Sequence, residues 1–231
     1  MDANVSDPES AHWPIRSRRS VRRFLDRGVS REKLTRILDT AAYSASGHNI
    51  QPWTVYVVEG DVKAKVTDGI LSAIESEPEE NHQPEFDYYP TQWFEPYLGR
   101  RREVGFKLYD LLGIARDDKV ARTRQLHENF RFFGAPVGLF LTFDRRLATG
   151  TYMDMGMFLQ SIMVAARIEG LDSCAQAIFN WYHKVVRGIL PMEEDELLVC
   201  GMSLGYADPV APENKLIAPK QKSDAFTHYV S

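Results

Sequence analysis

The sequence predicts an α+β fold, with several helices packed around one small sheet in a single domain that spans residues 1–231. The 231 residues are 44% hydrophobic, which is enough for one sizeable core and fits one large domain better than two small ones. Strand-like and helical segments alternate, but there are few strands for so many helices. No GxGxxG or GxxxxGK loop follows a strand, and these loops are the main sequence signatures of dinucleotide-binding and P-loop folds. The sequence therefore does not favour either of these folds.

The first clear helix begins after Ser30, whose hydroxyl can cap it. One face of this helix is apolar at helical spacing, through Val29, Leu34, Ile37, Leu38, Ala41 and Ala42. The helix is expected to end in SASGHN, where a glycine and an asparagine break the period. WTVYVVE, residues 53–59, is rich in β-branched and aromatic residues and predicts a strand, and residues 62–75 predict a weaker helix.

Residues 76–96 form an irregular excursion that is first acidic and then aromatic, with four prolines. Long loops that are rich in aromatic residues often cover a site. The alternative is a loop that packs only on its own domain. Both explanations remain open at this point.

The second half of the chain supplies the remaining elements. A helix is expected from Tyr97 to Leu112, and strands over 136–144 and 196–206. Residues 155–170 predict a helix that is apolar nearly all round, which indicates a central buried helix or a subunit interface. Residues 207–231 form a C-terminal arm with three prolines and little periodicity.

Composition excludes several classes of protein. Lys and Arg total 28 against 32 for Asp and Glu, so a nucleic-acid-binding protein, which usually has a basic excess, is not expected. The two cysteines lie far apart in apolar surroundings, which predicts buried free thiols in a reducing cytoplasm. No leader sequence, membrane-spanning run or metal-ligand spacing is visible. We therefore expect a cytoplasmic protein without a metal site or membrane contact.

The stretch SRRSVRRF, residues 17–24, gathers four arginines in a chain that is acidic overall. Three explanations compete: a solvated helix face, a basic arm for nucleic acid, and one wall of a phosphate pocket. A small anion site needs only local positive charge, so it is compatible with the formal net charge of −4.

Two further segments are unexplained by packing: ASGHNIQPW at 45–53 and GLDSCAQAIF at 170–179. Together with RRSVRRF and LVCGMSLGYADP, and in this order, they resemble the FMN-dependent nitroreductase family over nearly the whole chain. NFRFFGAPVGLFLTFDRRL looks most like the branch with nitrobenzoate and other aryl nitroreductases. The chain departs from the family pattern in three places. Ala45 and Gly47 stand where many members have Pro and Ser, and NKLIAPK has lysines where arginines are common.

The resemblance implies a nitroreductase-like fold with a mostly antiparallel central sheet flanked by helices. It also implies an intertwined homodimer, in which the helix over 155–169 is shared and the C-terminal arm is exchanged. The all-round apolar helix and the proline-rich arm support this expectation indirectly.

For FMN, the resemblance implies a phosphate site formed by Arg18, Ser20, Arg22 and Lys220. Arg18 and Arg22 face the same way if the segment is helical, and Lys220 acts as a point charge. Arg19 is expected nearer the flavin, whereas Arg23 is expected to be a plain surface charge.

The flavin ring is expected to meet a second set of residues, partly from the partner subunit. These are the loop residues Ala45, Ser46, Gly47 and Asn49, and the segment at Gln176 and Ala177, which donates a backbone N–H toward flavin N5. Arg131 is expected near flavin N1, where a cation stabilises the reduced ring. The alternative for Arg131 is a surface arginine.

The function implied is hydride transfer from NADH or NADPH, through flavin N5, to electron-poor aromatics such as nitroarenes, with ping-pong kinetics. No catalytic acid or base is evident, so solvent is expected to give the proton. Alternatives are a quinone reductase or reductive dehalogenase of the same family, or a non-enzymatic FMN-binding protein.

Overall fold

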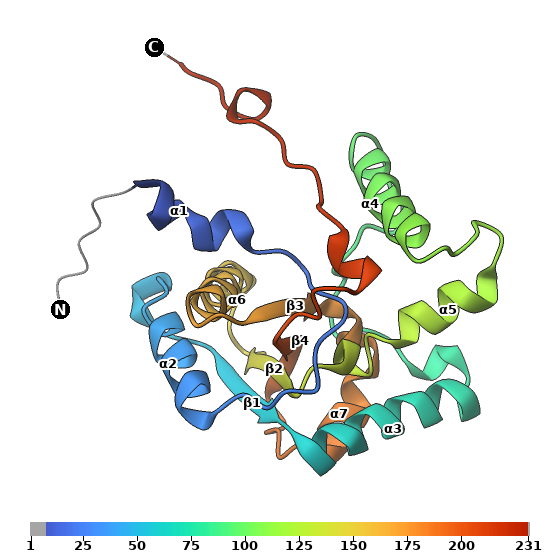
Figure 1. Cartoon of the computed structure of the whole chain (residues 1–231). Coiled ribbons are helices and arrows are strands. Elements are labelled where there is room, and N and C mark those ends of the chain that lie inside the picture. The colour runs from blue at the N-terminus through green and yellow to red at the C-terminus, as the bar shows by residue number, and fades with distance from the viewer. Residues whose placement is uncertain (1–7, 231) are drawn as a thin grey trace.

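The computed structural model describes residues 8–230, and its centre is one four-stranded antiparallel sheet in the order β1-β2-β4-β3 (Figure 1). The strands are β1 (Thr54–Val58), β2 (Val137–Asp144), β3 (Asp172–Gln176) and β4 (Glu196–Gly205). The helices are α1 (Pro8–Ser17), α2 (Arg31–Ala41), α3 (Gly60–Ser76), α4 (Tyr97–Leu111), α5 (Lys119–His127), α6 (Thr151–Ile168) and α7 (His183–Ile189). The α+β class and the antiparallel sheet are therefore confirmed.

The sheet is buried on both faces because its two central strands are apolar on both sides. Along β2, Leu139 and Leu141 pack in a cluster with α2 and α6, whereas Phe140 packs in a second cluster with α3 and α7. This alternation follows from the two-residue period of a strand. Figure 1 shows α2 and α6 to one side of the sheet and α3 and α7 to the other.

Two glycines let aromatic rings lie directly on the sheet. A Cβ atom at Gly138 would overlap the ring of Phe132, and one at Gly201 would overlap the ring of Phe179. Phe132 and Phe179 stack at 4.9 Å between ring centroids and are fully buried. These contacts fix the two short segments that precede β2 and follow β3, and both of those segments border the site described below.

The predicted helices and strands are found within a few residues of their expected bounds. Ser30 caps α2 as expected, accepting a hydrogen bond from the Lys33 backbone N–H at 3.4 Å. The sequence did not predict α1, α5, α7 or β3. The last of these matters most, because the segment assigned to a flavin contact forms an edge strand that ends at Gln176.

The helical geometry considered for the arginine cluster is wrong. Helix α1 ends at Ser17, and the chain then runs extended: Ser20 bridges Ser173 of β3, and the Val21 N–H donates to the Ser173 carbonyl at 3.1 Å. Alternate residues of an extended chain point to the same side. The side chains of Arg18 and Arg22 are therefore still expected on the same side of the segment. The reason is the two-residue alternation of an extended chain and not the spacing of a helix.

The apolar helix is not central. Helix α6 buries Met155, Phe158 and Ile162 in the core, but it leaves Met153 and Ile168 exposed on this chain. The central-helix explanation is therefore wrong, and the subunit interface stays a prediction. Within residues 8–230, no helix has the length and apolar character needed to cross a membrane.

The C-terminal arm begins along the body and then leaves it. Asn214, which is buried, accepts a hydrogen bond from the Arg22 backbone N–H at 2.8 Å and donates to the carbonyls of Arg23 and Asp208. Past this anchor the chain runs outward in Figure 1, and Ile217 and Phe226 are exposed.

Candidate functional site

A cavity of about 590 Å³ lies beside the extended arginine segment, and we call it the basic cavity. Five of the predicted cofactor residues line it: Arg18, Arg19, Ser20, Arg22 and Lys220. They come from the two ends of the chain, because the N-terminal segment runs along β3 and the C-terminal arm returns past it. The structure thus brings together the residues that the sequence assigned to a phosphate.

The basic cavity carries positive charge that nearby carboxylates do not neutralise. Its one acidic residue, Asp172, is paired with Arg167 at 2.7 Å. Within residues 8–230, no carboxylate lies within ion-pair distance of Arg18, Arg22 or Lys220. Among the residues that the structure describes, the Arg22 guanidinium donates only to the Ser20 carbonyl, at 3.3 Å. Such a set of cationic donors suits a doubly charged phosphate.

Arg23 points away from this cavity and has a structural role. Its Nε donates at 3.1 Å to the carboxylate of Glu213, a side chain that is 2% exposed. A second carboxylate, that of Glu128, lies 3.8 Å away. The expectation that Arg23 is a plain surface charge is wrong, because a buried carboxylate needs a paired cation.

A second cavity, of about 430 Å³, lies at the end of β3, and we call it the central cavity. Arg22 lines both cavities, so the two meet at its side chain. Gln176 and Ala177, predicted from the sequence, line the central cavity together with Asn129. The basic cavity therefore adjoins, at Arg22, a second cavity bordered by the last residues of β3.

The Gln176 side chain stabilises the wall of the central cavity through hydrogen bonds at both ends of its amide. It is buried, it donates to the Asn129 carbonyl at 2.6 Å, and it accepts from the Ser203 hydroxyl at 2.6 Å. Both ends of its amide are thus occupied by protein groups, which fixes the backbone at 176 and 177. That backbone is the part of the segment the sequence assigned to the cofactor.

Asn129 lies in the central cavity and Arg131 does not. The Arg131 side chain is 48% exposed and lies 3.9 Å from the Glu128 carboxylate, outside the cavities described here. The sequence predicted a cation, Arg131, near the flavin, whereas the structure places the polar side chain of Asn129 in the central cavity. Two residues with positive φ, Phe132 and Phe133, turn the chain here, and no pattern in the sequence signalled that turn.

The loop residues Ala45, Ser46, Gly47 and Asn49 are not brought to these cavities by this chain. They lie between α2 and β1, against the start of α6, where the Gly47 N–H donates to the Asp154 carboxylate at 3.3 Å. The side chain of Asn49 is exposed, and its backbone has positive φ. A role for this loop in the site therefore requires a second chain.

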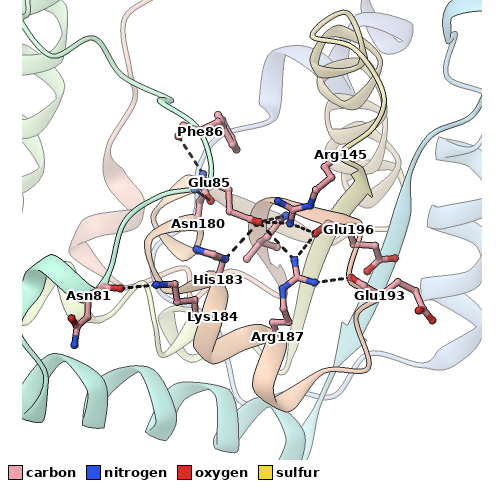
Figure 2. Close-up of polar contacts among 11 residues, drawn as sticks. Asn81, Glu85, Phe86, Arg145, Asn180, His183, Lys184, Arg187, Glu193 and Glu196 are labelled. Atoms are coloured by element: carbon pink, nitrogen blue, oxygen red, sulfur yellow. Dashed lines mark hydrogen bonds and ion pairs between the residues drawn. The ribbon is translucent and has the colours of Figure 1, made fainter.

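The start of the aromatic stretch in the 76–96 excursion is held by a set of polar residues that we call the clamp: Glu85, Asn180, Arg145, His183 and Arg187 (Figure 2). Asn180 accepts from the Glu85 N–H at 2.9 Å and donates to the Phe86 carbonyl at 3.4 Å. The Glu85 side chain, 5% exposed, accepts from the Leu198 N–H at 2.8 Å and from Arg145 at 2.6 Å. Segment 85–86 is thereby fixed to the sheet.

Two further basic groups complete the clamp. The Arg187 guanidinium lies 3.7 Å and the His183 Nδ1 3.6 Å from the Glu85 carboxylate. Burial lowers the pKa of His183 despite the nearby carboxylate. The arginines therefore supply the charge that balances Glu85 near neutral pH.

A third cavity, of about 660 Å³, opens beyond the clamp, and we call it the aromatic cavity. It shares Phe86, Asp87, Tyr88 and Tyr89 with the central cavity. Burial raises the pKa of Tyr88 and of Tyr152, and it raises the pKa of Cys200 to about 12. These lining groups are therefore uncharged at neutral pH.

The excursion is thus divided between the two explanations left open. Residues 86–89 line cavities, whereas Trp93 and Phe94 line none of the cavities described here and contact other aromatic rings of the excursion and of α4. The three arginines at 100–102 also lie outside the central and aromatic cavities.

Comparison with known proteins gives consistent matches. The model of the nitroreductase family matches residues 15–206. Nitrobenzene nitroreductase of Ectopseudomonas oleovorans is 42% identical over 216 residues, which cover 94% of this chain and 95% of that protein.

Solved structures match as well. The FMN- and NADPH-dependent nitroreductase NfnB from sphigopyxis sp. strain HMH has a TM-score of 0.92 and 41% identity, covering 96% of this chain and 99% of that one. The FMN-dependent nitroreductase NfnB from Mycobacterium smegmatis, solved in complex with NADPH, has a TM-score of 0.90 and 31% identity, covering 96% and 99%.

Proposed function

Because the chain belongs to the nitroreductase family, we propose that it is an FMN-dependent enzyme that uses NADH or NADPH to reduce electron-poor aromatics such as nitroarenes. The observation that carries the proposal is the basic cavity, in which Arg18, Arg22 and Lys220 have no carboxylate partner among the described residues. It adjoins, at Arg22, a second cavity at the end of β3. The relatives named above are nitroreductases, and two of them are FMN-dependent.

The donors of the basic cavity fit the terminal phosphate of FMN, which carries roughly two negative charges. Arg18 and Arg22 offer guanidinium donors, Ser20 a hydroxyl and Lys220 a point charge. The central cavity then offers Asn129 and the backbone at Gln176 and Ala177 to the polar edges of a flat ring. FMN, when bound, supplies the chemistry of hydride transfer and aromatic reduction.

The protein's part is binding and placement. Arg22 and Gln176 fix the two ends of the cofactor site, and the aromatic residues at 86–89 offer stacking surface to a nicotinamide or a flat acceptor. Since one open region serves both ligands, we propose that they occupy it in turn, which gives ping-pong kinetics. The proton that the product needs is assigned to solvent.

We also propose that two chains complete the site. Ala45, Ser46, Gly47 and Asn49 would then reach the partner's cofactor, because on their own chain they lie away from the cavities. The exposed apolar residues of α6 and the outward C-terminal arm are the surfaces that a partner would bury.

The test is to identify the released cofactor and the kinetic pattern of the purified protein. Heating should release FMN and not FAD. Initial rates measured against NADPH and nitrobenzene should give parallel double-reciprocal lines. Absence of FMN would overturn the cofactor assignment, and intersecting lines would overturn the ping-pong scheme.

A further inference from the structure

We propose that Asp87 makes the aromatic cavity select uncharged nitroarenes over carboxylated ones. This inference rests on the proposed function and names the class of acceptor that the site prefers. Asp87 lines both the central and the aromatic cavity, where an acceptor must lie to meet the cofactor.

The Asp87 carboxylate has no partner that would neutralise it. Within residues 8–230, no hydrogen bond or ion pair involves its side chain, which is exposed. The remaining lining of the aromatic cavity is apolar or uncharged, from rings such as Phe86 and Tyr152 to the thiol of Cys200. An anion entering this cavity therefore meets one negative charge and no positive one.

The arginines at 100–102, which follow the aromatic excursion in the sequence, lie outside both cavities. Arg100 lies over the ring of Tyr97 at 5.6 Å, and Arg101 lies over the ring of Trp93 at 4.7 Å. Arg22 also borders the central cavity, at the place where that cavity adjoins the basic cavity. Its positive charge is balanced there by the phosphate that we propose for the basic cavity. No cation of the described chain is thus left to balance Asp87 beside the acceptor.

The clamp keeps Asp87 in this position. Asn180 bonds the backbone on both sides of the 85–86 peptide (Figure 2). The Phe86 ring packs on Tyr152 at 4.8 Å between ring centroids. Asp87 is the next residue, so its backbone has little freedom to move away from the cavity. Like charges held close together in one cavity repel, and such repulsion is a common source of specificity.

The experiment compares kcat/KM for nitrobenzene and for 4-nitrobenzoate in the FMN-loaded enzyme. The wild type should prefer nitrobenzene. Asp87→Asn should raise the kcat/KM for 4-nitrobenzoate relative to that for nitrobenzene by about three- to thirtyfold. Most of this change should come from a higher kcat/KM for 4-nitrobenzoate. Asp87→Glu should keep the wild-type preference, and added salt should narrow the wild-type difference because it screens the charge.

The matched control is Asp68→Asn, which removes the same charge from an exposed position on α3 that lines none of the cavities described here. It should leave the ratio unchanged. The proposal is overturned if Asp87→Asn keeps the wild-type ratio, if Asp68→Asn changes it equally, or if the wild type prefers 4-nitrobenzoate. If the wild type reduces neither compound, the result counts against the proposed function. If it reduces nitrobenzene normally, the proposed function stands, and the ratio then tests the role of Asp87 alone.

Discussion

Arg22 is the residue on which the two parts of the proposed cofactor site converge, because its side chain borders both the basic and the central cavity. Its backbone is fixed by Asn214, so the guanidinium is directed by a rigid segment. Arg22→Ala should weaken FMN binding by about 1.5–3 kcal/mol, or about ten- to a hundredfold, since it removes a charge-assisted contact. Fluorescence titration of the apoprotein with FMN measures this.

Arg31→Ala is the control for Arg22. Arg31 begins α2, is exposed, and lines neither cavity, so this variant loses the same charge without losing a ligand contact. Unchanged FMN affinity in the Arg22 variant, or an equal loss in both, would remove Arg22 from the site.

The two cysteines should be inert in the native protein although both border cavities. Burial raises the pKa of Cys174 above its ordinary value, and it raises that of Cys200 to about 12, so both are protonated thiols at neutral pH. At pH 8 about one Cys200 in ten thousand is a thiolate, the reactive form. A disulfide reagent at pH 8 should therefore label no cysteine before denaturation and both after it; rapid native labelling would contradict this.

At the scale of elements, the clamp is what fixes the aromatic wall of the site. Glu85→Gln keeps the shape of the side chain but removes the charge that Arg145 and Arg187 balance. The unfolding free energy should fall by about 1.5–3 kcal/mol, measured by urea denaturation. Amide exchange at residues 85–89 should speed up more than exchange in the core strands.

Glu193→Gln is the matched control for the clamp. The Glu193 side chain is exposed, and only its backbone carbonyl contacts Arg187. This variant should behave as the wild type. If both variants lose the same stability, or if Glu85→Gln leaves exchange at 85–89 unchanged, the clamp does not hold the aromatic wall.

The elements that could be predicted are those with a strong local pattern. Helix α2 has a cap and an apolar face, and β1, β2 and β4 are dense in β-branched or aromatic residues. β3 could not be predicted, because DSCAQ is small and polar and becomes a strand only by pairing with β4. The extended course of residues 18–22 likewise depends on pairing with β3, a contact that no local pattern encodes.

The candidate site was predictable in composition but not in geometry. The motif positions identified Arg18, Arg22 and Lys220, which the structure places around one cavity although Lys220 lies about two hundred residues beyond the two arginines. Arg23, in the same motif, instead pairs with the buried Glu213, and only the folded arm shows that. Short motifs identify which residues meet; the contacts of each side chain depend on the packing of distant segments.

At the scale of the whole molecule, we expect a dimer of about twice 26.4 kDa. A charge at Phe158 or Ile162 would not test this, because both side chains are buried in the chain's own core. Met153→Glu is the better variant, since Met153 is exposed on α6. By sedimentation at low micromolar concentration, it should shift the protein toward monomer and lower its FMN content, since the loop at 45–49 would no longer reach a partner's site.

Val62→Glu is the control for the dimer. Val62 is an exposed apolar residue on α3, which packs in the core cluster on the face of the sheet opposite α6. It should leave the dimer and the FMN content as in the wild type. A wild-type monomer that holds FMN fully would refute the two-chain site.

The central claim is that this chain passes electrons from a nicotinamide to a nitroarene through FMN at the site around Arg22. The most direct measurement is anaerobic stopped-flow absorbance of the purified FMN-loaded protein. Mixing with NADPH or NADH should bleach the flavin band rapidly, and nitrobenzene added in a second mix should restore it without further nicotinamide. A flavin band that neither nicotinamide bleaches, or a bleached band that nitrobenzene leaves unchanged, would contradict the account.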